Sequence, residues 1–344
     1  MTGPYVHSID PIIASVFGAH LWWYGLGFSL GFLTIYFSVK SGRETLGFTV
    51  PMVYDLAILV SAGVLFGGRF IEVVFYEWPF YRDHPQLIPA YWLGGMATHG
   101  LLLGAMAGIL LFCRIHRWPF LVVTDALAVP AAFIMGFGRI GNFIDGQIVG
   151  SPTDAWWGVQ FPDAGGYRHP VVLYDGIKNF LLIPLLLFVH RFRRAPGTVT
   201  GVFLFLYALL RVFIDFFREY PTSLLGLATG QVLNLAMSTG GLALFAWAVK
   251  RRRTPGPVAR DGSISDARNG QAGAVAWRAV LFASLVVFPL VIPSDWTQDI
   301  PERYGKRHPG LRHSALYPAI SRLNATSDIV EGGCVPNGSS PRCP

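Results

Sequence analysis

Eight long apolar stretches constrain this chain more than any other feature. Each is about 20 residues long and carries few charges, which is the length a helix needs to cross a hydrocarbon core of roughly 30 Å. Only 14% of the 344 residues are charged, well below the roughly 25% of a soluble domain. We therefore predict an all-α polytopic integral membrane protein whose spans are residues 18–38, 53–74, 96–113, 120–139, 170–189, 198–217, 230–249 and 276–293.

The basic residues alternate between connections in a way that sets the topology. They concentrate in every second connection, at Lys40 and Arg43, at Arg114 and Arg117, at Arg191, Arg193 and Arg194, and in the segment from Lys250. By the positive-inside rule these connections face the cytoplasm, so both termini of an eight-span chain are expected outside. Because the net charge of +7 follows this alternation, it does not indicate a nucleic-acid partner.

The composition changes near residue 250. We expect a seven-span body at residues 1–250, a basic cytoplasmic linker at 251–275, an extra transmembrane helix at 276–293 and an external tail at 294–344. Cys113 lies at the inner end of its span, where a reduced thiol is expected. We predict that Cys334 and Cys343, in the tail, form a disulfide outside the membrane.

Polar and ionisable side chains gather near the outer ends of six predicted spans. In chain order they are Tyr24, Arg69, Glu72, His99, Arg139, Asn142, Tyr174, Asp175, Lys178, Tyr207, Arg211 and Asp215. Ionisable residues are costly inside a membrane and usually face the protein interior or a water-filled cavity, so their common depth indicates one site. Arg69, Arg139 and Arg211 call for an anion, because arginine presents a planar fork suited to phosphate. The glycines of "GFGRIG" would let a phospholipid headgroup approach the backbone closely.

Each of these residues also has a plainer interpretation. Arg139 or Arg218 could extend to lipid headgroups. Arg211 with Asp215, and Asp175 with Lys178, could be structural ion pairs. Tyr24 and Tyr174 could belong to the aromatic belt, and His99 could be a hydrogen-bonded histidine at a helix end. The glycines around Arg139 could equally serve close helix packing. The convergence of all these groups at one depth is what favours a shared site.

Five short motifs identify the family that the chain resembles. In the order and approximate spacing of bacterial prolipoprotein diacylglyceryl transferase, over about residues 15 to 250, the chain carries "LFGGR", "GGMATHG", "GRIGNFIDG", "RHPVVLYD" and "YALLRVFIDFFRE". The resemblance implies a multi-pass enzyme of the bacterial inner (plasma) membrane. Such an enzyme transfers the diacylglyceryl group of phosphatidylglycerol to the lipobox cysteine of a prolipoprotein and releases glycerol phosphate. Its partners are those two substrates and membrane lipid, with no cofactor, metal or nucleic acid.

The important positions of the family fall mostly on residues that the depth argument singles out. Catalytic roles are expected for Tyr24, His99, Arg139, Tyr207 and Arg211. His99, with Tyr207, is the candidate base for the thiol, and Arg139 with Arg211 would hold the phosphate. Substrate-binding positions are expected at Arg69, Arg139, Asn142, Asp145, Gln147, Gly150, Tyr174 and Asp215.

The chain departs from the family pattern at several positions. Leu101 stands where a glycine is usual, Gln147 where a glutamate is usual and Asp145 where an asparagine is usual, and Asp175 and Asp215 each replace a usual glutamate. These differences leave open an altered paralogue that binds phospholipid without transferring it, or that uses another acceptor. A solute transporter is disfavoured, because the chain shows neither an internal repeat nor paired spans broken by glycine or proline.

Overall fold

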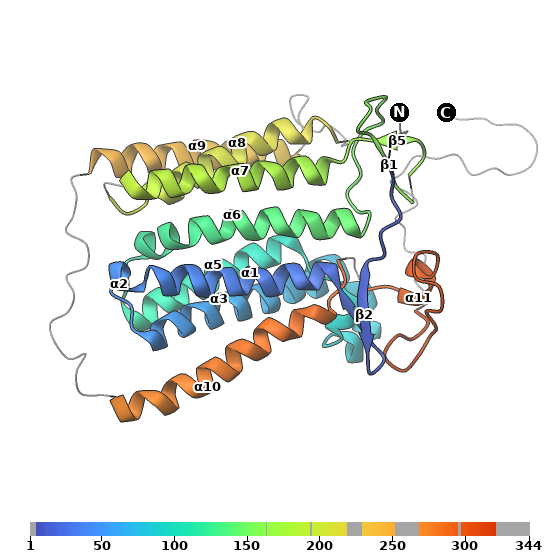
Figure 1. Ribbon diagram of the computed structural model, residues 1–344, viewed down its shortest axis with the longest axis horizontal. Coiled ribbons are helices and arrows are strands. Elements are labelled where there is room, and N and C mark those ends of the chain that lie inside the picture. The colour runs from blue at the N-terminus through green and yellow to red at the C-terminus, as the bar shows by residue number, and fades with distance from the viewer. Residues whose placement is uncertain are drawn as a thin grey trace, which may run out of the picture.

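Long helices dominate the part of the chain that this computed structural model describes, which is residues 5–162, 164–192, 195–218, 229–251, 268–294 and 297–320. They are α1 (Trp23–Ser41), α3 (Val50–Ile71), α5 (Thr98–His116), α6 (Phe120–Ile144), α7 (Val171–Phe192), α8 (Thr198–Asp215), α9 (Thr229–Lys250) and α10 (Arg268–Val287). These helices run roughly side by side along the long axis of the molecule (Figure 1). Short helices α2 (Arg43–Leu46), α4 (Trp78–Asp83) and α11 (Ile300–Tyr304) lie at the two ends.

The membrane architecture agrees with expectation, with one difference in count. Within the described residues, seven helices are long and apolar enough to cross a membrane, and they correspond to the second to eighth predicted spans. The first predicted span corresponds to α1, which has 19 residues but is less apolar because glycine, serine and tyrosine recur along it. Helix α1 nevertheless packs against α3 and α6. The polytopic all-α class is therefore confirmed.

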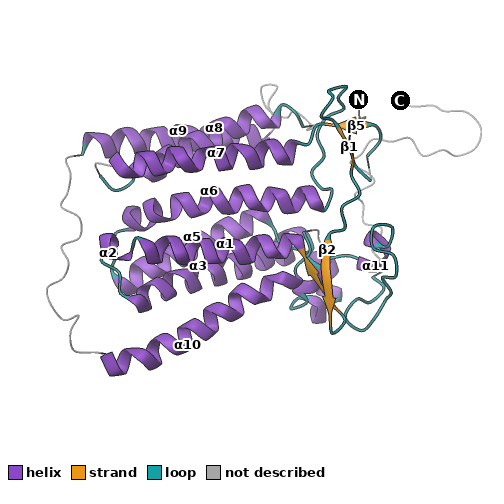
Figure 2. Ribbon diagram, viewed as in Figure 1, coloured by secondary structure: helices purple, strands orange, loops and turns teal. Residues whose placement is uncertain are grey.

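A β-hairpin shifts the start of α1 from the expected residue 18 to Trp23. Strands β2 (Ile12–Val16) and β3 (Ala19–Trp22) pair antiparallel. Phe17 and Gly18, both with positive φ, make the turn, so the backbone cannot be helical there. A second small sheet joins β1 (Tyr5–Val6), β4 (Val159–Gln160) and β5 (Tyr167–Arg168). Figure 2 shows the strands at one end of the helical bundle.

Glycine sets the distance between α3 and α5, which pack together extensively. A Cβ added at Gly104 of α5 would lie 1.8 Å from the carbonyl oxygen of Gly63 on α3. A Cβ at Gly67 of α3 would lie 2.4 Å from the carbonyl oxygen of Gly100. Only residues without side chains allow the two backbones to approach this closely, as is common between membrane helices.

The helix beyond residue 250 is docked onto the bundle. Helix α10 packs against α1 and α3, and the Nε of Arg278 lies 2.6 Å from Oδ1 of Asp55 on α3. The helix begins at Arg268, so the last residues of the linker expected at 251–275 are helical instead. The alanine, glutamine and arginine residues of "RNGQAGAVAWR" favour a helix, where the polar composition had indicated a linker.

The described part of the tail covers the hairpin end of the bundle. Ile300, Tyr304 and Tyr317 are buried in one apolar cluster with Ile12 and Trp22 of the hairpin. The hydroxyl of Tyr317 also accepts a hydrogen bond from the backbone N–H of His20 at 2.9 Å.

The cysteine predictions concern different parts of the chain. Cys113 is buried in α5 with a free thiol. Cys334 and Cys343 lie outside the described residues, so their predicted disulfide stays a prediction.

Candidate functional site

One buried carboxylate joins three helices at the end of the bundle where α6 and α8 end and α7 begins. Asp175 of α7 is fully buried, and its Oδ2 accepts hydrogen bonds from Nε of Arg139 on α6 at 2.7 Å and from an Nη of Arg211 on α8 at 2.5 Å. Its Oδ1 lies 2.7 Å from Nζ of Lys178, one turn along α7. Arg211 also reaches Oδ1 of Asp215 at 3.2 Å. We call these five residues the Asp175 cluster.

The Asp175 cluster carries an excess of positive charge. Its three cations face two carboxylates, which leaves one positive charge uncompensated within the cluster. The side chains of Arg139 and Arg211 are 20% and 13% exposed, whereas that of Asp175 is 0% exposed, so the arginines form the accessible side. In the described residues no group of three His, Cys, Asp or Glu could hold a metal ion. The excess of cations on the accessible side of the cluster is suited to an anion.

Some glycines near Arg139 allow close helix packing, and one borders open space. A Cβ at Gly176 would lie 3.4 Å from the Cβ of Arg139, so α6 and α7 meet closely beside Asp175. A Cβ at Gly141 would lie 3.2 Å from the Cα of Tyr24, which brings the start of α1 against α6. At Gly138, by contrast, an added Cβ would meet nothing within 4 Å. Two of the glycines are therefore packing positions, and Gly138 borders open space.

Three further predicted residues adjoin the cluster. An Nη of Arg139 donates to Oδ1 of Asn142 at 3.2 Å, one turn further along α6. Tyr207 of α8 presents its ring to Lys178, whose Nζ lies 3.9 Å from the ring centroid. Tyr24 of α1 lies against Gly141, two residues after Arg139 on α6. The structure thus brings together residues from α1, α6, α7 and α8 that the sequence separates by up to about 190 positions.

Arg69 does not share this site, contrary to the expectation of three guanidiniums around one cavity. Its side chain is buried and donates to the backbone carbonyls of the loop that follows α4, those of Leu87, Ile88, Ala90, Gly94 and Gly95. Because these carbonyls occupy its donors, Arg69 organises the loop between α4 and α5. The sequence of its span could not show the loop that folds over Arg69.

His99 contacts a tyrosine at the end of the neighbouring helical segment. Its side chain is exposed at the start of α5, and Nδ1 lies 3.1 Å from the hydroxyl of Tyr76. It makes no hydrogen bond or ion pair with the cluster among the described residues. Tyr76 ends a π-helical turn, Glu72–Tyr76, which continues α3 and is a local irregularity often found at functional sites.

The residues after α6 turn away from the helix. Asp145 is buried directly after the last helical residue, and the backbone N–H of Gln147 donates to the carbonyl of Asn142 at 3.0 Å. Gly150 packs where a Cβ would lie 2.5 Å from the carbonyl oxygen of His169. Gly150 is therefore required to bring the loop against the start of α7.

Tyr174 borders an open groove of about 840 Å³ beside the cluster. Its hydroxyl accepts a hydrogen bond from Nε1 of Trp157 at 2.7 Å and lies 3.0 Å from Nδ1 of His169. The lining is largely aromatic and apolar, from Tyr5, Phe143, Trp156, Trp157, Gly158, Val159, Pro170, Leu173, Tyr174 and Ile177. Such a lining suits the apolar part of a lipid.

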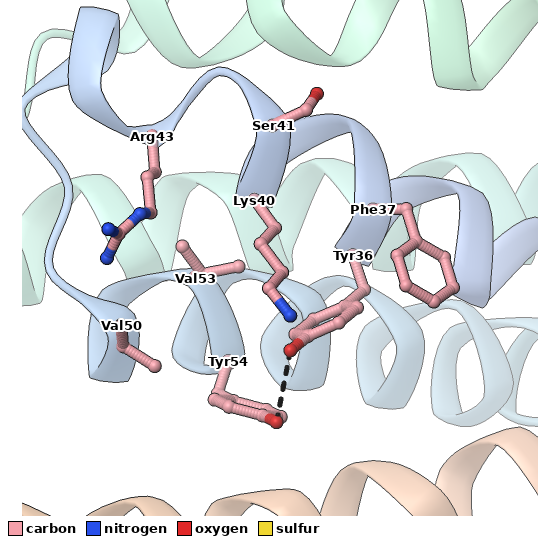
Figure 3. Close-up of a pocket in the computed structure, with 8 residues that line it drawn as sticks. All are labelled: Tyr36, Phe37, Lys40, Ser41, Arg43, Val50, Val53 and Tyr54. Atoms are coloured by element: carbon pink, nitrogen blue, oxygen red, sulfur yellow. Dashed lines mark hydrogen bonds between the residues drawn. The ribbon is translucent and has the colours of Figure 1, made fainter.

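A second hollow, of about 660 Å³, lies at the opposite end of α1 (Figure 3). Lys40 points over the ring of Tyr36 there, with Nζ 5.3 Å from the ring centroid, and Tyr36 donates a hydrogen bond to Tyr54 at 3.1 Å. Its lining contains none of the predicted site residues. The polar cluster and this hollow therefore belong to opposite ends of the bundle.

Sequence reasoning missed the central role of Asp175. The spacing of Asp175 and Lys178 indicated only a local ion pair, which the structure contains. The two arginines that share the carboxylate are each 36 positions away, on different helices. No periodicity within one span predicts such a contact. The depth argument placed Asp175 near the arginines, but it could not predict that one carboxylate pairs with both of them.

Comparisons with known proteins relate the chain to one family of membrane transferases. The profile of the prolipoprotein diacylglyceryl transferase family matches residues 11–247. The chain is 37% identical over 256 residues to the phosphatidylglycerol–prolipoprotein diacylglyceryl transferase of Pseudoalteromonas atlantica, covering 72% of this chain and 91% of that protein. It is 38% identical over 256 residues to the protein of the same name from Geobacter sulfurreducens, covering 72% of this chain and 98% of that protein.

Proposed function

This chain belongs to the prolipoprotein diacylglyceryl transferase family, and on that premise we propose how its residues perform the reaction. It transfers the diacylglyceryl group of phosphatidylglycerol to the lipobox cysteine of a lipoprotein precursor and releases glycerol phosphate. The observation that supports a phosphate site most directly is the pairing of Arg139 and Arg211 on one buried carboxylate. Asp175 holds the two guanidiniums close together on the accessible side of the cluster.

Arg139 and Arg211 bind the phosphodiester of the lipid. The cluster has one surplus positive charge, and a phosphodiester carries one negative charge, so binding neutralises the site. Each guanidinium keeps N–H groups beyond those it gives to Asp175, and arginine can present two of them to one phosphate. Asn142 and Asp215 orient the arginines, and the open space at Gly138 gives the headgroup room.

The transfer step builds negative charge on the same phosphate. The thiolate sulfur forms a bond to the glycerol carbon of the diacylglyceryl group, and the bond between that carbon and the phosphate oxygen breaks. The bonding electrons leave with the oxygen, so the phosphodiester becomes the monoester glycerol phosphate with additional negative charge. Two fixed guanidiniums stabilise the transition state more than the ground state, which is the condition for catalysis.

His99 accepts the thiol proton in this proposal. For Nε2 to accept a proton, Nδ1 must carry its hydrogen and donate it to the hydroxyl of Tyr76, 3.1 Å away. Such an orienting partner is typical of histidine bases. The exposed position of His99 leaves its ring reachable by an acceptor peptide within the membrane.

The site faces the outer side of the bacterial inner membrane. The described basic residues at Lys40, Arg43, Arg114, Arg117 and Arg191 sit at helix ends opposite to the Asp175 cluster. The positive-inside rule places that end in the cytoplasm. Strand β1 and helix α11, which Figure 1 shows at the end where α6 finishes, are then external.

The function is tested with purified protein in phosphatidylglycerol vesicles and a synthetic lipobox peptide. Mass spectrometry should detect diacylglyceryl peptide together with an equal amount of glycerol phosphate. A peptide with serine in place of the lipobox cysteine should remain unmodified, because its hydroxyl is a much weaker nucleophile at neutral pH.

The same assay separates the enzyme from the altered paralogue. Vesicles of phosphatidylcholine in place of phosphatidylglycerol serve as the lipid control. A known family transferase serves as the positive control. If this transferase is active while the protein binds phosphatidylglycerol but yields no modified peptide, the protein is a phospholipid-binding protein and not an enzyme.

A further inference from the structure

The C-terminal end of α6 is capped by two distant parts of the chain. The last carbonyls of a helix have no partner within the helix and need donors from elsewhere. Nε2 of His7 lies 2.7 Å from the carbonyl oxygen of Phe143. Arg307 donates from its two Nη atoms to the carbonyl oxygens of Ile144 at 3.3 Å and Asp145 at 3.1 Å. Together these donors bind three consecutive carbonyls.

Arg307 is the charged member of this pair of caps. Burial lowers the pKa of His7 below its ordinary value, so its imidazole is neutral near pH 7. Arginine is always protonated at that pH, and a cation stabilises the negative C-terminal end of a helix dipole. The guanidinium of Arg307 thus supplies both hydrogen bonds and charge to the last turn of α6.

The segment that carries Arg307 is itself anchored. The guanidinium lies 5.3 Å from the ring centroid of Tyr304, which is fully buried beneath the hairpin. The next residue, His308, has its Nδ1 2.5 Å from Oδ2 of Asp10. Contacts of Tyr304 and His308 therefore fix the position of Arg307 from both sides along the chain.

Arg307 lies outside the part of the chain that matches the family, which ends at residue 247. The turn that it caps follows directly on Arg139 and Asn142, the residues that we assign to the phosphate. Resting on that proposed function, we propose that Arg307 is a positioning residue for the transfer reaction. It fixes the last turn of α6, and through it the geometry of Arg139 and Asn142 toward the phosphate of the lipid.

The test compares Arg307→Ala, Arg307→Lys and the matched control Arg312→Ala, an exposed arginine in the same segment. All are purified in full length and assayed for peptide transfer, for phosphatidylglycerol binding in vesicles and for thermal unfolding. Arg307→Ala should lower kcat about tenfold through loss of a charged hydrogen bond and a dipole interaction, with the KM for peptide unchanged. Arg307→Lys should recover part of that loss, and Arg312→Ala should match wild type.

A double variant separates positioning from a merely structural effect. If Arg307 acts through Arg139, combining Arg307→Ala with Arg139→Lys should cost less than the product of the two single losses, because the groups share one geometry. If the loss of kcat in the double variant equals the product of the two single losses, the two residues act independently and the proposal is overturned. A normal kcat for Arg307→Ala, or a loss fully explained by a lower fraction of folded protein, would also overturn it.

Phosphatidylglycerol binding keeps this inference distinct from the proposed function. If wild type binds the lipid but transfers nothing, the proposed transfer fails, and weaker lipid binding by Arg307→Ala than by Arg312→Ala still supports positioning. Equal binding by the two variants would then overturn it. A wild type that neither binds nor transfers would overturn both.

Discussion

At the scale of single residues, the functional and plain interpretations of the buried charges describe the same contacts. Asp175 with Lys178 and Arg211 with Asp215 are ion pairs, as the plain interpretation expects. The second carboxylate oxygen of Asp175 nevertheless gathers two guanidiniums from two other helices. A structural pair needs only one cation for one carboxylate. The additional positive charge is what favours an anion site.

The first prediction concerns the fork of the two arginines. Arg139→Lys and Arg211→Lys should each lower the transfer rate by a factor on the order of 10² to 10³, because an ammonium offers a point charge in place of two parallel N–H groups. The measurement is diacylglyceryl transfer at matched membrane abundance. The control is Arg114→Lys, which changes an exposed arginine near the C-terminal end of α5, away from the Asp175 cluster. This variant should keep the wild-type rate. Near-normal rates for both site variants would end the assignment of a phosphate clamp.

The second prediction concerns Gln147, which lies just beyond the capped end of α6 and takes the place of the usual glutamate of the family. A neutral amide can orient groups but cannot make the charge-assisted hydrogen bonds that a carboxylate at this position would make. Gln147→Glu should therefore raise or preserve turnover, and Gln160→Glu on strand β4 serves as the control for an added charge. Comparison of kcat for the two variants checks this. A severe loss in Gln147→Glu alone would show that the site has adapted to the amide.

At the scale of elements, glycine decides which helices approach closely and which residues they place together. Contact between α6 and α7 at Gly176 sets Arg139 beside Asp175, and contact between α1 and α6 at Gly141 sets Tyr24 beside the same turn. Contact between α3 and α5 positions Tyr76 and His99 at the ends of those helices. The predicted spans occur in the expected order with shifted bounds, but these contacts depend on which helix faces meet.

The third prediction tests the glycine contact between α3 and α5. Gly104→Val should destabilise the fold, since even the first carbon of the new side chain would lie 1.8 Å from the carbonyl oxygen of Gly63. Overpacking of this kind costs typically about 1–3 kcal/mol and often more where backbone blocks relaxation. The thermal midpoint in detergent and the yield of monodisperse protein should both fall. Gly240→Val on α9, where an added Cβ meets nothing within 4 Å, should leave both nearly unchanged.

At the scale of the whole molecule, the segment beyond residue 250 is integrated with the family body. Helix α10 is tied to α3 through Arg278 and Asp55, and the tail reaches the end of α6 through Arg307. The linker of polar composition suggested an appended unit. In the structure, the added residues contact the bundle at both of its ends. They are therefore packed against the same body that contains the site.

The fourth prediction is that the site end of the bundle faces outside the cell. In a background with the three native cysteines replaced by serine, Lys306→Cys should react with a membrane-impermeant maleimide in intact cells. Lys40→Cys should react only after the membrane is permeabilised, because it lies at the opposite end in the basic set of connections. The reverse pattern of labelling would invert the proposed topology and place the transfer site in the cytoplasm.

The sequence by itself determined the helical membrane class, the order of the spans and the family. These properties follow from local composition and motif order, because hydropathy acts on each span separately. Only the tertiary structure decided that Asp175 joins Arg139 to Arg211, that Arg69 belongs to a loop, that α1 starts after a hairpin and that Arg307 caps α6. Each of these depends on side chains meeting across long separations. Helix rotation and close packing set such contacts, and the pattern within one span contains neither.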